Sequence, residues 1–387
     1  MWQKIKNNLR ACWWKLGMRN NIPDFQHELA DIISQHPDQK IIIFPPGLEW
    51  QETKLQRPQH IARALANQGI LVFYAVPETS NQSNGFKMFA DNLFLSHVPL
   101  NTFNIIVDPY VLTMTWNYQF AKQISDARII YDYVDHLPAF SGSQKNLEQY
   151  HKHLIQEAEI ILATSKSLLQ EVQTYRSDAI LCPNGVDYDH FATQENARVN
   201  PPADIAPLLS EGNPIIGYSG ALARWVDYDL LEATVHNRPD LHFLLIGADF
   251  DHTLPAKLLK APNLTWLETK PYSALPGYVQ NFDVAIIPFC VNDLTHAVSP
   301  LKLFEYMAAG KPVVITPMEE SMRYPGVLVA QNPQEFSKRL DEALELRADH
   351  DYLQTIQKVA HENTWNVRAQ QIKQALVNGS NSFGTTL

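Results

Sequence analysis

Two hydrophobic patterns alternate along this chain. Short runs of isoleucine, valine and leucine are typical of strands that are buried on both faces, and the segments between them carry apolar residues at helical spacing. The short runs form two sets, at residues 40–44, 70–75, 104–107, 128–133, 159–163 and 179–182, and at residues 214–218, 242–246, 264–267, 283–288, 312–316 and 326–329. Because such strands alternate with helices in parallel sheets, the two sets predict an α/β protein with two doubly wound, Rossmann-like domains.

The segments around the two sets complete the predicted domain plan. Helical patterns at residues 57–68 and 147–157 lie within the first set of strands. Proline, asparagine and charged residues are frequent between the two sets, which is typical of a linker. The plan is an amino-terminal segment at 1–20, a first domain at 21–190, a linker region at 191–213, a second domain at 214–350, a helix at 351–377 that packs back on the first domain, and a flexible tail at 378–387.

Residues 297–316 predict a helix that begins at an anion-binding site. Ser299 is suited to cap the helix and Pro300 to occupy its first position, where the missing N–H costs nothing. The free amide groups of a helix start carry about half a positive charge and favour an anion. Lys302 stands in this first turn, and Glu305 follows one turn later, where its carboxylate can accept hydrogen bonds from a sugar diol. The pattern therefore predicts a ribose-diphosphate site; the alternative is a solvated ion pair between the two side chains.

The same segment carries a family resemblance. The run AVSPLKLFEYMAAGKPVVIT resembles the Pro-x-Lys-x-x-Glu-Tyr and Ala-Ala-Gly-x-Pro-Val-Val signature of GT-B glycosyltransferases, in particular family 4 and the teichuronic-acid-biosynthesis type. Similar segments are spread over roughly residues 40 to 375: KIIIFPPGLEW, YDYVDHL, ATSKSL, PNGVD, IIGYSGALARWVDYDLL, FDVAIIPF and HENTWNVRAQQI. The resemblance implies the GT-B architecture, in which two Rossmann-like domains face a cleft. It also implies transfer of a sugar from a nucleotide-diphosphate sugar, which is a substrate and not a cofactor, to a glycan or lipid-linked acceptor in cell-surface polysaccharide synthesis.

The resemblance, together with the rule that ligands lie beyond the carboxyl ends of parallel strands, implies a nucleotide-sugar site in the second domain. Its expected members are Ser219, Gly220, Arg224, Gly247, Leu267, Tyr272, Ser299, Pro300, Leu301, Lys302 and Glu305. We expect Gly220 to let the backbone approach a phosphate, and Arg224, one turn into the next helix, to make a bidentate phosphate contact. In this interpretation Lys302 and Arg224 stabilise the leaving diphosphate and Glu305 holds the ribose. The alternatives are a surface charge at Arg224 and an ordinary turn at Gly247.

The first domain contributes candidates for the acceptor. Asp135 follows the predicted strand at 128–133 and is the candidate general base on an acceptor hydroxyl, if the enzyme inverts. It could instead orient the acceptor or cap the next helix. His136, Trp50 and Arg57 are candidate acceptor contacts, although Trp50 and Arg57 could equally fix the first loop.

One departure from the family pattern leaves the outcome of the reaction open. Many family-4 enzymes carry a further glutamate about two turns before the one on the ribose, near the transferred sugar, whereas this chain has apolar Ala297 and Val298 in that region. The ribose role carries over to Glu305, but the sugar contact and the retaining stereochemistry do not. A nucleotide-sugar epimerase of the same fold and a non-catalytic nucleotide-sugar-binding subunit therefore remain as alternatives.

Composition narrows the class of protein. The chain has 387 residues, a net charge of −10 and a pI near 5.8, which argue against nucleic acid as the main partner. Cys12, Cys182 and Cys290 are isolated, which suits a reducing cytosol and no zinc site. The triplet at residues 249–251 is the best Asp-x-Asp candidate for a metal, but so short a pattern is weak evidence in a chain with 41 acidic residues, so no metal is expected.

Residues 1–20, MWQKIKNNLRACWWKLGMRN, differ from the rest of the chain. They carry lysine and arginine but no acidic residue, and large apolar residues recur close to helical spacing. Two interpretations remain: an amphipathic helix on an anionic membrane surface, or a terminal helix packed on the protein. Because the charge of the segment opposes that of the rest of the chain, we favour the membrane, which predicts a cytoplasmic enzyme held at the inner face of the cell membrane.

Overall fold

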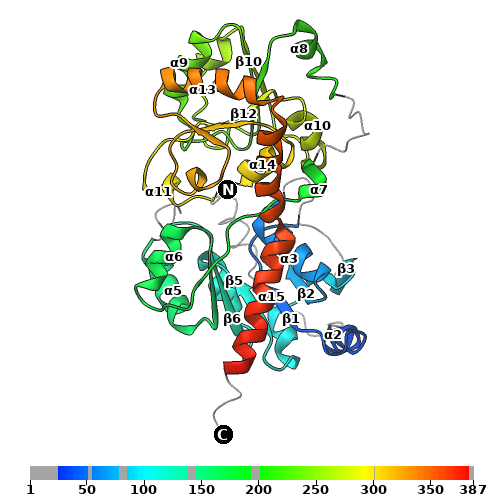
Figure 1. Cartoon of the computed structure of the whole chain (residues 1–387). Helices are drawn as coiled ribbons and strands as arrows, with labels where there is room; N and C mark the ends of the chain where they lie inside the picture. Colours follow the sequence, from blue (N-terminus) through cyan, green and yellow to red (C-terminus); the bar gives the residue numbers. More distant parts are fainter. Residues whose placement is uncertain are drawn as a thin grey trace. The chain divides into compact units, whose positions relative to one another are not determined.

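The computed structural model describes residues 25–50, 55–77, 85–137, 144–192, 201–299 and 301–382. The predicted amphipathic segment at 1–20, Pro300 and the last five residues of the predicted tail lie outside this part of the chain. The chain divides into two compact units, many of whose elements are labelled in Figure 1. Unit 1 takes the residues up to Pro183 and from Trp365 onward, and unit 2 takes residues 184–364.

Unit 1 contains a sheet with the strand order β3-β4-β2-β1-β5-β6-β7-β8. Its strands are β1 (Ile41–Phe44), β2 (Leu71–Ala75), β3 (Gly85–Ala90), β4 (Leu93–His97), β5 (Tyr110–Thr113), β6 (Arg128–Tyr133), β7 (Ile160–Ala163) and β8 (Ile180–Leu181). All neighbours pair in parallel except β3 and β4. Every residue of β2, β5 and β7 is buried, as expected for strands covered on both faces.

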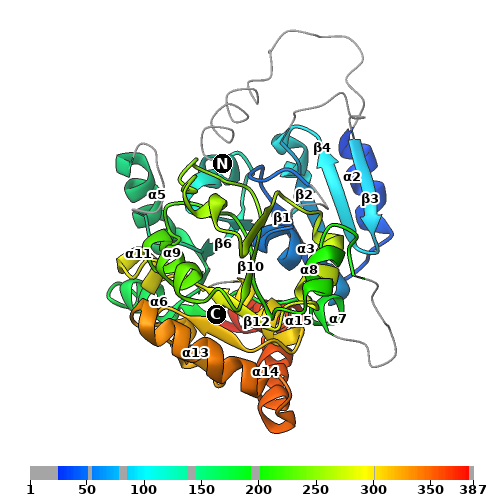
Figure 2. The same cartoon turned by 90° about the horizontal axis from the view of Figure 1, so that it is seen from above.

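Helices cover this sheet. They are α2 (Phe25–Ser34), α3 (Arg57–Asn67), α4 (Tyr118–Ala121), α5 (Gln144–Glu157), α6 (Lys166–Gln173) and α15 (Trp365–Ser382). Helix α2 lies beside the edge strand β3 (Figure 2), and α15 runs along α3 (Figure 1). The ring of Trp365 stacks on that of His60 at 4.9 Å, and Lys373 Nζ donates to the carbonyl of Gln68 at 2.6 Å. The last helix of the chain therefore belongs to the core of unit 1.

The predicted strand at residues 104–107 is wrong. The chain there forms a 3₁₀ helix, η2 (Leu100–Ile105), and the strand of the sheet is β5. The apolar residues at 104–107 predicted a buried strand, but Val107 is 86% exposed. Asp108, with φ 48°, then turns the chain before β5 begins. The antiparallel pair β3 and β4 was not predicted, since its edge strand has mostly exposed or half-buried residues and lacks a continuous apolar run.

Unit 2 contains a six-stranded sheet in the order β11-β10-β9-β12-β13-β14. Its strands are β9 (Ile215–Ser219), β10 (His242–Ile246), β11 (Leu264–Leu267), β12 (Val284–Ile287), β13 (Val313–Ile315) and β14 (Val327–Val329). All pair in parallel, and each overlaps one of the predicted runs. The prediction of two doubly wound parallel sheets is confirmed. The order reverses between β9 and β12, which is where such sheets bind nucleotides.

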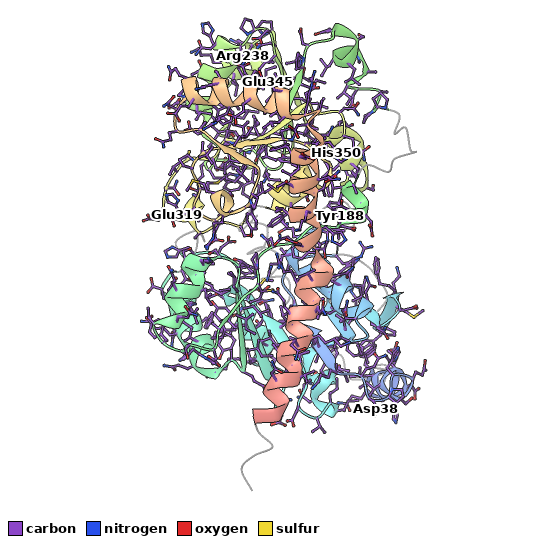
Figure 3. All side chains as sticks on the ribbon, in the orientation of Figure 1. Asp38, Tyr188, Arg238, Glu319, Glu345 and His350 are labelled. Atoms are coloured by element: carbon purple, nitrogen blue, oxygen red, sulfur yellow. The ribbon has the colours of Figure 1, made fainter. Side chains whose placement is uncertain are left out.

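The helices of unit 2 complete its layers. They are α7 (Tyr188–Phe191), α8 (Ala206–Glu211), α9 (Tyr228–Asn237), α10 (Leu275–Val279), α11 (Asp293–His296), α12 (Leu301–Ala308), α13 (Pro333–Leu346) and α14 (His350–Glu362). Arg238, which follows α9 and is labelled in Figure 3, pairs with Asp341 of α13 at 2.8 Å. No helix in the described part of the chain is both long and apolar enough to cross a bilayer.

Three predicted boundaries differ from the structure. The predicted linker region contains α8. The single helix predicted at 351–377 is two helices, because the helical backbone breaks at Asn363 and Thr364: Thr364 bridges to Val186, and the Val186 N–H donates to the carbonyl of Asn363 at 3.0 Å. Helix α15 then continues to Ser382, so the first residues of the predicted tail are helical.

Candidate functional site

Helix α12 stands at the centre of the predicted nucleotide-sugar site. It begins at Leu301 and places Leu303, Phe304, Met307 and Ala308 in the core of unit 2. The chain turns after it at Gly310, with φ 67°. Ser299, just before the helix, is buried, and Asn184 holds it with two hydrogen bonds. The backbone N–H of Asn184 donates to Ser299 Oγ at 3.2 Å, and its side-chain amide donates to the Ser299 carbonyl at 2.6 Å.

Two glycines bring the loops after β9 and β10 together. Gly220 has φ 154° and Gly247 has φ 144°, a region that disfavours side chains. The Gly220 N–H donates to the carbonyl of Ile246 at 2.8 Å, and a β-carbon on Gly247 would overlap the carbonyl oxygen of Gly220. The two loops therefore pack backbone against backbone at the carboxyl ends of the strands, where only glycine fits.

The Lys302 side chain lies against the backbone of Gly220, which has no side chain of its own. Its Nζ is 5.1 Å from the ring centroid of Phe289 and 5.5 Å from that of Tyr218, so its charge is held by aromatic faces. The side chains of Lys302 and Glu305 make no hydrogen bond, and no ion pair within 4.0 Å, with another residue of the described chain. Both side chains are half-buried. The alternative of a simple solvated ion pair is therefore not what the structure shows.

Burial acts on both charges of this helix face. Desolvation lowers the pKa of Lys302, and the nearby carboxylate opposes this only in part. Desolvation likewise raises the pKa of Glu305, and Lys302 opposes it in part. Two half-buried charged groups with no hydrogen-bonding partner in the described protein are costly, unless a ligand completes their contacts.

Tyr306 fixes the end of β9 against α12. Its hydroxyl accepts a hydrogen bond from the Ser219 N–H at 2.7 Å and donates to the Ser219 carbonyl at 3.3 Å. The side chain is fully buried. Tyr306 was missed as a site residue although it belongs to the Glu-Tyr pair of the motif. The signal was present, because a buried tyrosine hydroxyl needs a hydrogen-bond partner.

Arg224 does not lie in a helix, which corrects the prediction. It is in the loop between β9 and α9, its side chain is exposed, and its backbone N–H donates to Asp251 Oδ2 at 3.0 Å. Helix α9 starts later because Asp227 caps it, accepting from the Leu230 N–H at 2.9 Å. The loop is tied to the one after β10, where the Phe250 N–H donates to the carbonyl of Leu222 at 2.8 Å.

The Asp-x-Asp candidate for a metal is part of the same loop pair. Asp251 accepts the Arg224 N–H and the hydroxyl of Thr253, and Asp249 accepts the Leu254 N–H at 3.3 Å. Across the described ranges, no three histidine, cysteine or acidic side chains gather as metal ligands.

The remaining candidates of unit 2 contribute mainly through backbone and packing. The Leu267 carbonyl accepts the Gly247 N–H at 3.0 Å, which ties β11 to the glycine loops. The buried ring of Tyr272 stacks on His190, with centroids 4.5 Å apart, and its carbonyl lies 3.0 Å from His190 Nε2.

In unit 1, Arg57 and Trp50 are held by the protein itself. Arg57 is 5% exposed, and its Nε and Nη2 each donate to Asp132 at 2.8 Å. Nη2 also donates to the carbonyl of Cys182 and Nη1 to that of Pro183. The ring of Trp50 packs on Tyr74 and Phe89, with centroids 4.9 and 4.8 Å away. These contacts favour the interpretation in which both residues fix the structure, and Asp132, the partner of Arg57, was not predicted.

Asp135 and His136 lie in the loop after β6. Desolvation raises the pKa of Asp135 to about 7; Arg57 opposes the rise and Asp132 adds to it. A carboxyl group that titrates near neutral pH suits a general base. His136 is 39% exposed, and its Nε2 lies 3.8 Å from Glu171 Oε2. Glu171 was not among the predicted residues.

Comparison with known proteins identifies the second unit. A sequence model of the family described as glycosyl transferases group 1 matches residues 213–346. TuaH of Bacillus subtilis (strain 168), named as a teichuronic acid biosynthesis glycosyltransferase, is 28% identical over 265 residues. The match covers 63% of this chain and 66% of TuaH, so the chain spans just under two thirds of that relative.

Solved structures extend the likeness to most of the chain. A sucrose-phosphate synthase from Thermosynechococcus elongatus superposes with a TM-score of 0.65 at 16% identity, over 89% of this chain and 100% of that one. HepE from Anabaena, solved with UDP-glucose, gives 0.63 at 17%, over 88% and 99%. An Escherichia coli protein bound with UDP-2-fluoro glucose superposes with a TM-score of 0.64 at 13% identity, over 87% of this chain and 99% of that one. Such identities establish the fold alone, which is that of the GT-B glycosyltransferases. Residues 213–346, which carry the sheet of unit 2 and helix α12, are therefore similar to the glycosyl transferases group 1 family, and the chain has the GT-B fold.

Proposed function

We propose that this protein is a glycosyltransferase that moves a sugar from a nucleotide-diphosphate sugar to a glycan or lipid-linked acceptor. The proposal rests on one face of α12. There the half-buried side chains of Lys302 and Glu305 have no hydrogen-bonding partner in the described protein, and Lys302 lies beside Gly220, which has no side chain. The group 1 match over the same residues supports it. The name of TuaH supports a role in cell-surface polysaccharide synthesis, and the HepE complex supports UDP-glucose as a first donor to test.

The chemistry assigned to each group follows from its charge. The acceptor oxygen bonds to the anomeric carbon, the bond from that carbon to the diphosphate breaks, and the nucleoside diphosphate leaves with the electron pair. Lys302, the start of α12 and the exposed Arg224 stabilise the charge on the leaving group. Glu305 accepts hydrogen bonds from the ribose. Asp135 takes the proton of the acceptor hydroxyl if the configuration inverts.

A screen of nucleotide sugars tests the proposal. The purified full-length chain is incubated with UDP-, GDP-, ADP- and dTDP-sugars, first alone and then with a lipid-linked glycan fraction. Release of the nucleoside diphosphate, with the sugar appearing in the lipid fraction, is the expected result. An epimerised donor without transfer would indicate the epimerase, and binding without any turnover would indicate a non-catalytic subunit.

We also propose that transfer needs no metal. Two observations support this: Lys302 and the start of α12 can supply the positive charge that a metal would otherwise bring to the diphosphate, and both oxygens of Asp251 already accept hydrogen bonds, one from Thr253 and one from the Arg224 N–H of the neighbouring loop. Activity should survive EDTA. Loss of turnover with EDTA, restored by Mg²⁺ or Mn²⁺, would overturn this part of the proposal.

A last part of the proposal concerns residues 1–20. Their lysines, arginines and tryptophans support binding to an anionic membrane surface on the cytoplasmic side, with each cation near the surface contributing about 1 kcal/mol. The protein should sediment with vesicles containing phosphatidylglycerol but not with pure phosphatidylcholine, and added salt should release it. Equal sedimentation of the full chain and of a chain lacking residues 1–20 would contradict this.

A further inference from the structure

Two aromatic rings flank the ammonium group of Lys302 at the carboxyl end of the unit 2 sheet. Tyr218 lies near the end of β9, and Phe289 follows shortly after β12. Their ring centroids are 6.4 Å apart with the planes at 65°, and both side chains are buried. Lys302 Nζ lies 5.5 Å from the first centroid and 5.1 Å from the second, within the range of a cation–π contact. The strand order reverses between β9 and β12, so the rings stand where a doubly wound sheet binds its ligand.

Hydrogen bonds fix the segments that carry both rings. The Tyr218 hydroxyl donates to the carbonyl of Ala221 at 2.8 Å, which holds the ring against the loop after β9. The carbonyl of Phe289 accepts from the hydroxyl of the buried Thr316 at 2.6 Å. The backbone of Phe289 also bridges to Val226, in the loop before α9. Both rings are therefore held in place by the fold of unit 2.

The Lys302 side chain is half-buried, whereas a lysine kept for its aliphatic stem would extend its ammonium group into water. Its Nζ lies 2.9 Å from the position that a β-carbon on Gly220 would take, so the ammonium group stands over the backbone at the end of β9. No acceptor in the described part of the chain forms a hydrogen bond with it. The two ring faces therefore offset part of the loss of water around the charge, because an aromatic face attracts a cation electrostatically.

The titratable groups around Lys302 differ in their effect on it. Desolvation lowers the pKa of Lys302, and the carboxylate of Glu305, one turn along α12, opposes this only in part. Burial raises the pKa of Tyr218 and of Tyr306 well above that of an ordinary tyrosine, so both hydroxyls stay neutral. Phe289 does not titrate. Removal of a ring face should therefore make it easier for Lys302 to lose its proton.

We propose that Tyr218 and Phe289 are positioning residues, which hold the ammonium group of Lys302 over Gly220 to meet the diphosphate of the donor. The inference rests on the proposed function, since it concerns the residues that prepare the diphosphate contact before the donor arrives. Neither ring is assigned a contact with the sugar or with the acceptor. A cation that is already fixed in place loses less freedom when the diphosphate binds, and this favours binding.

The effect of the rings on Lys302 can be measured without any ligand. In full-length protein that carries ¹³C-labelled lysine, the titration of the Lys302 ε-carbon is followed by NMR, and the Lys302→Met variant identifies its signal. Phe289→Leu and Tyr218→Leu each remove a ring and keep an apolar side chain. We expect the pKa of Lys302 to be lower in both variants than in the wild type, because a ring face that favours the cation is gone. Tyr218→Phe keeps the ring, and its Lys302 should titrate like that of the wild type.

Binding of the nucleoside diphosphate is the second measurement. UDP, GDP, ADP and dTDP are titrated into the full-length protein by calorimetry, from neutral to alkaline pH. The affinity of each leucine variant should fall roughly 3- to 30-fold, and its decline at alkaline pH should begin at a lower pH than in the wild type. Phe336→Leu, at a buried phenylalanine of α13, is the matched control for a ring lost elsewhere in unit 2. It should bind like the wild type at every pH.

The two measurements separate the inference from the proposed function. Wild-type titration of Lys302 and wild-type affinity in folded Phe289→Leu and Tyr218→Leu would overturn the inference. An affinity loss of equal size at every pH with an unchanged titration would also overturn it, since a distorted site gives that result. If Phe289→Leu does not fold, Phe289→Met keeps more of the volume and takes its place. If the wild type binds none of the four nucleoside diphosphates while the titration shifts as expected, the proposed function fails and the effect of the rings on Lys302 stands.

Discussion

Lys302 occupies the space that a side chain on Gly220 would need. A β-carbon on Gly220 would lie 2.5 Å from Lys302 Cε and 2.9 Å from its Nζ. Both distances are shorter than atoms in contact allow. The lysine can reach over the end of β9 only because the residue below it is glycine, and a phosphate approaching that backbone meets the ammonium group at once.

Gly220→Ala should therefore damage the donor site. The added methyl must displace Lys302, and we expect a cost of about 1–3 kcal/mol, or roughly 5- to 150-fold in kcat/KM for the donor. Gly212→Ala is the matched control, because Gly212 has φ 80° and nothing within 4 Å of its β-position. It should lose about 1–2 kcal/mol of stability from its backbone while its donor kinetics stay unchanged. Equal kinetic losses in both variants would argue against the steric account.

Lys302→Met keeps most of the aliphatic stem and removes the charge. Loss of a charge-assisted contact of about 1.5–3 kcal/mol predicts a 10- to 150-fold loss of donor affinity, measured by calorimetry with the nucleoside diphosphate. The melting temperature should not fall, since a half-buried cation is replaced by an apolar group. Lys257→Met is the control, because Lys257 is 81% exposed. Wild-type affinity in a folded Lys302→Met protein would refute the assignment.

Arg57→Met should destabilise unit 1 rather than alter acceptor binding directly. It leaves Asp132 buried without its guanidinium partner, and removing one member of a buried ion pair costs about 3–5 kcal/mol. Each kcal/mol corresponds to roughly 2–4 °C in the melting temperature for domains of this size. Arg63→Met, at an exposed arginine of the same helix, should change it little. A folded Arg57→Met protein with normal melting and weakened acceptor binding would restore Arg57 to the acceptor site.

Asp135→Asn should raise stability and lower activity. The pKa of Asp135 in the folded protein is about 7, above the value of about 3.9 in an unfolded chain. Between these values the unfolded state releases a proton that the folded state keeps, so the carboxyl group costs stability as the pH rises through this window. The variant should melt higher than wild type at pH 8 and no higher at pH 4. If Asp135 is the general base, transfer should also fall by about 10²- to 10⁴-fold, and wild-type transfer should increase as the pH passes through about 7.

The donor site could be predicted from local sequence patterns to a greater extent than the acceptor site. The six strands of unit 2 and helix α12 carry their information in short apolar runs and a cap, so their places were predictable. The salt bridge between Arg57 and Asp132 joins segments far apart in the chain. Such pairs meet only when the strands and helices of the sheet have packed, and no local pattern in a single sequence indicates which residues will meet. Arg224 was wrongly predicted to lie in a helix, because the helix begins only after Asp227, whose side chain caps it.

The break at Asn363 and Thr364 also has a consequence for how the protein is made. Residues 184–364 of unit 2 are consecutive in the sequence, whereas unit 1 needs α15, which is synthesised after them. Until then the face of α3 that bears His60 has no cover, since the ring that stacks on it belongs to Trp365. The sheet of unit 1 is therefore synthesised before residues 184–364, but unit 1 is completed only after them. A chain cut after residue 364 would contain all of residues 184–364 but would lack the cover of α15 on unit 1, and we expect unit 1 to stay open to chaperones and proteases in that form.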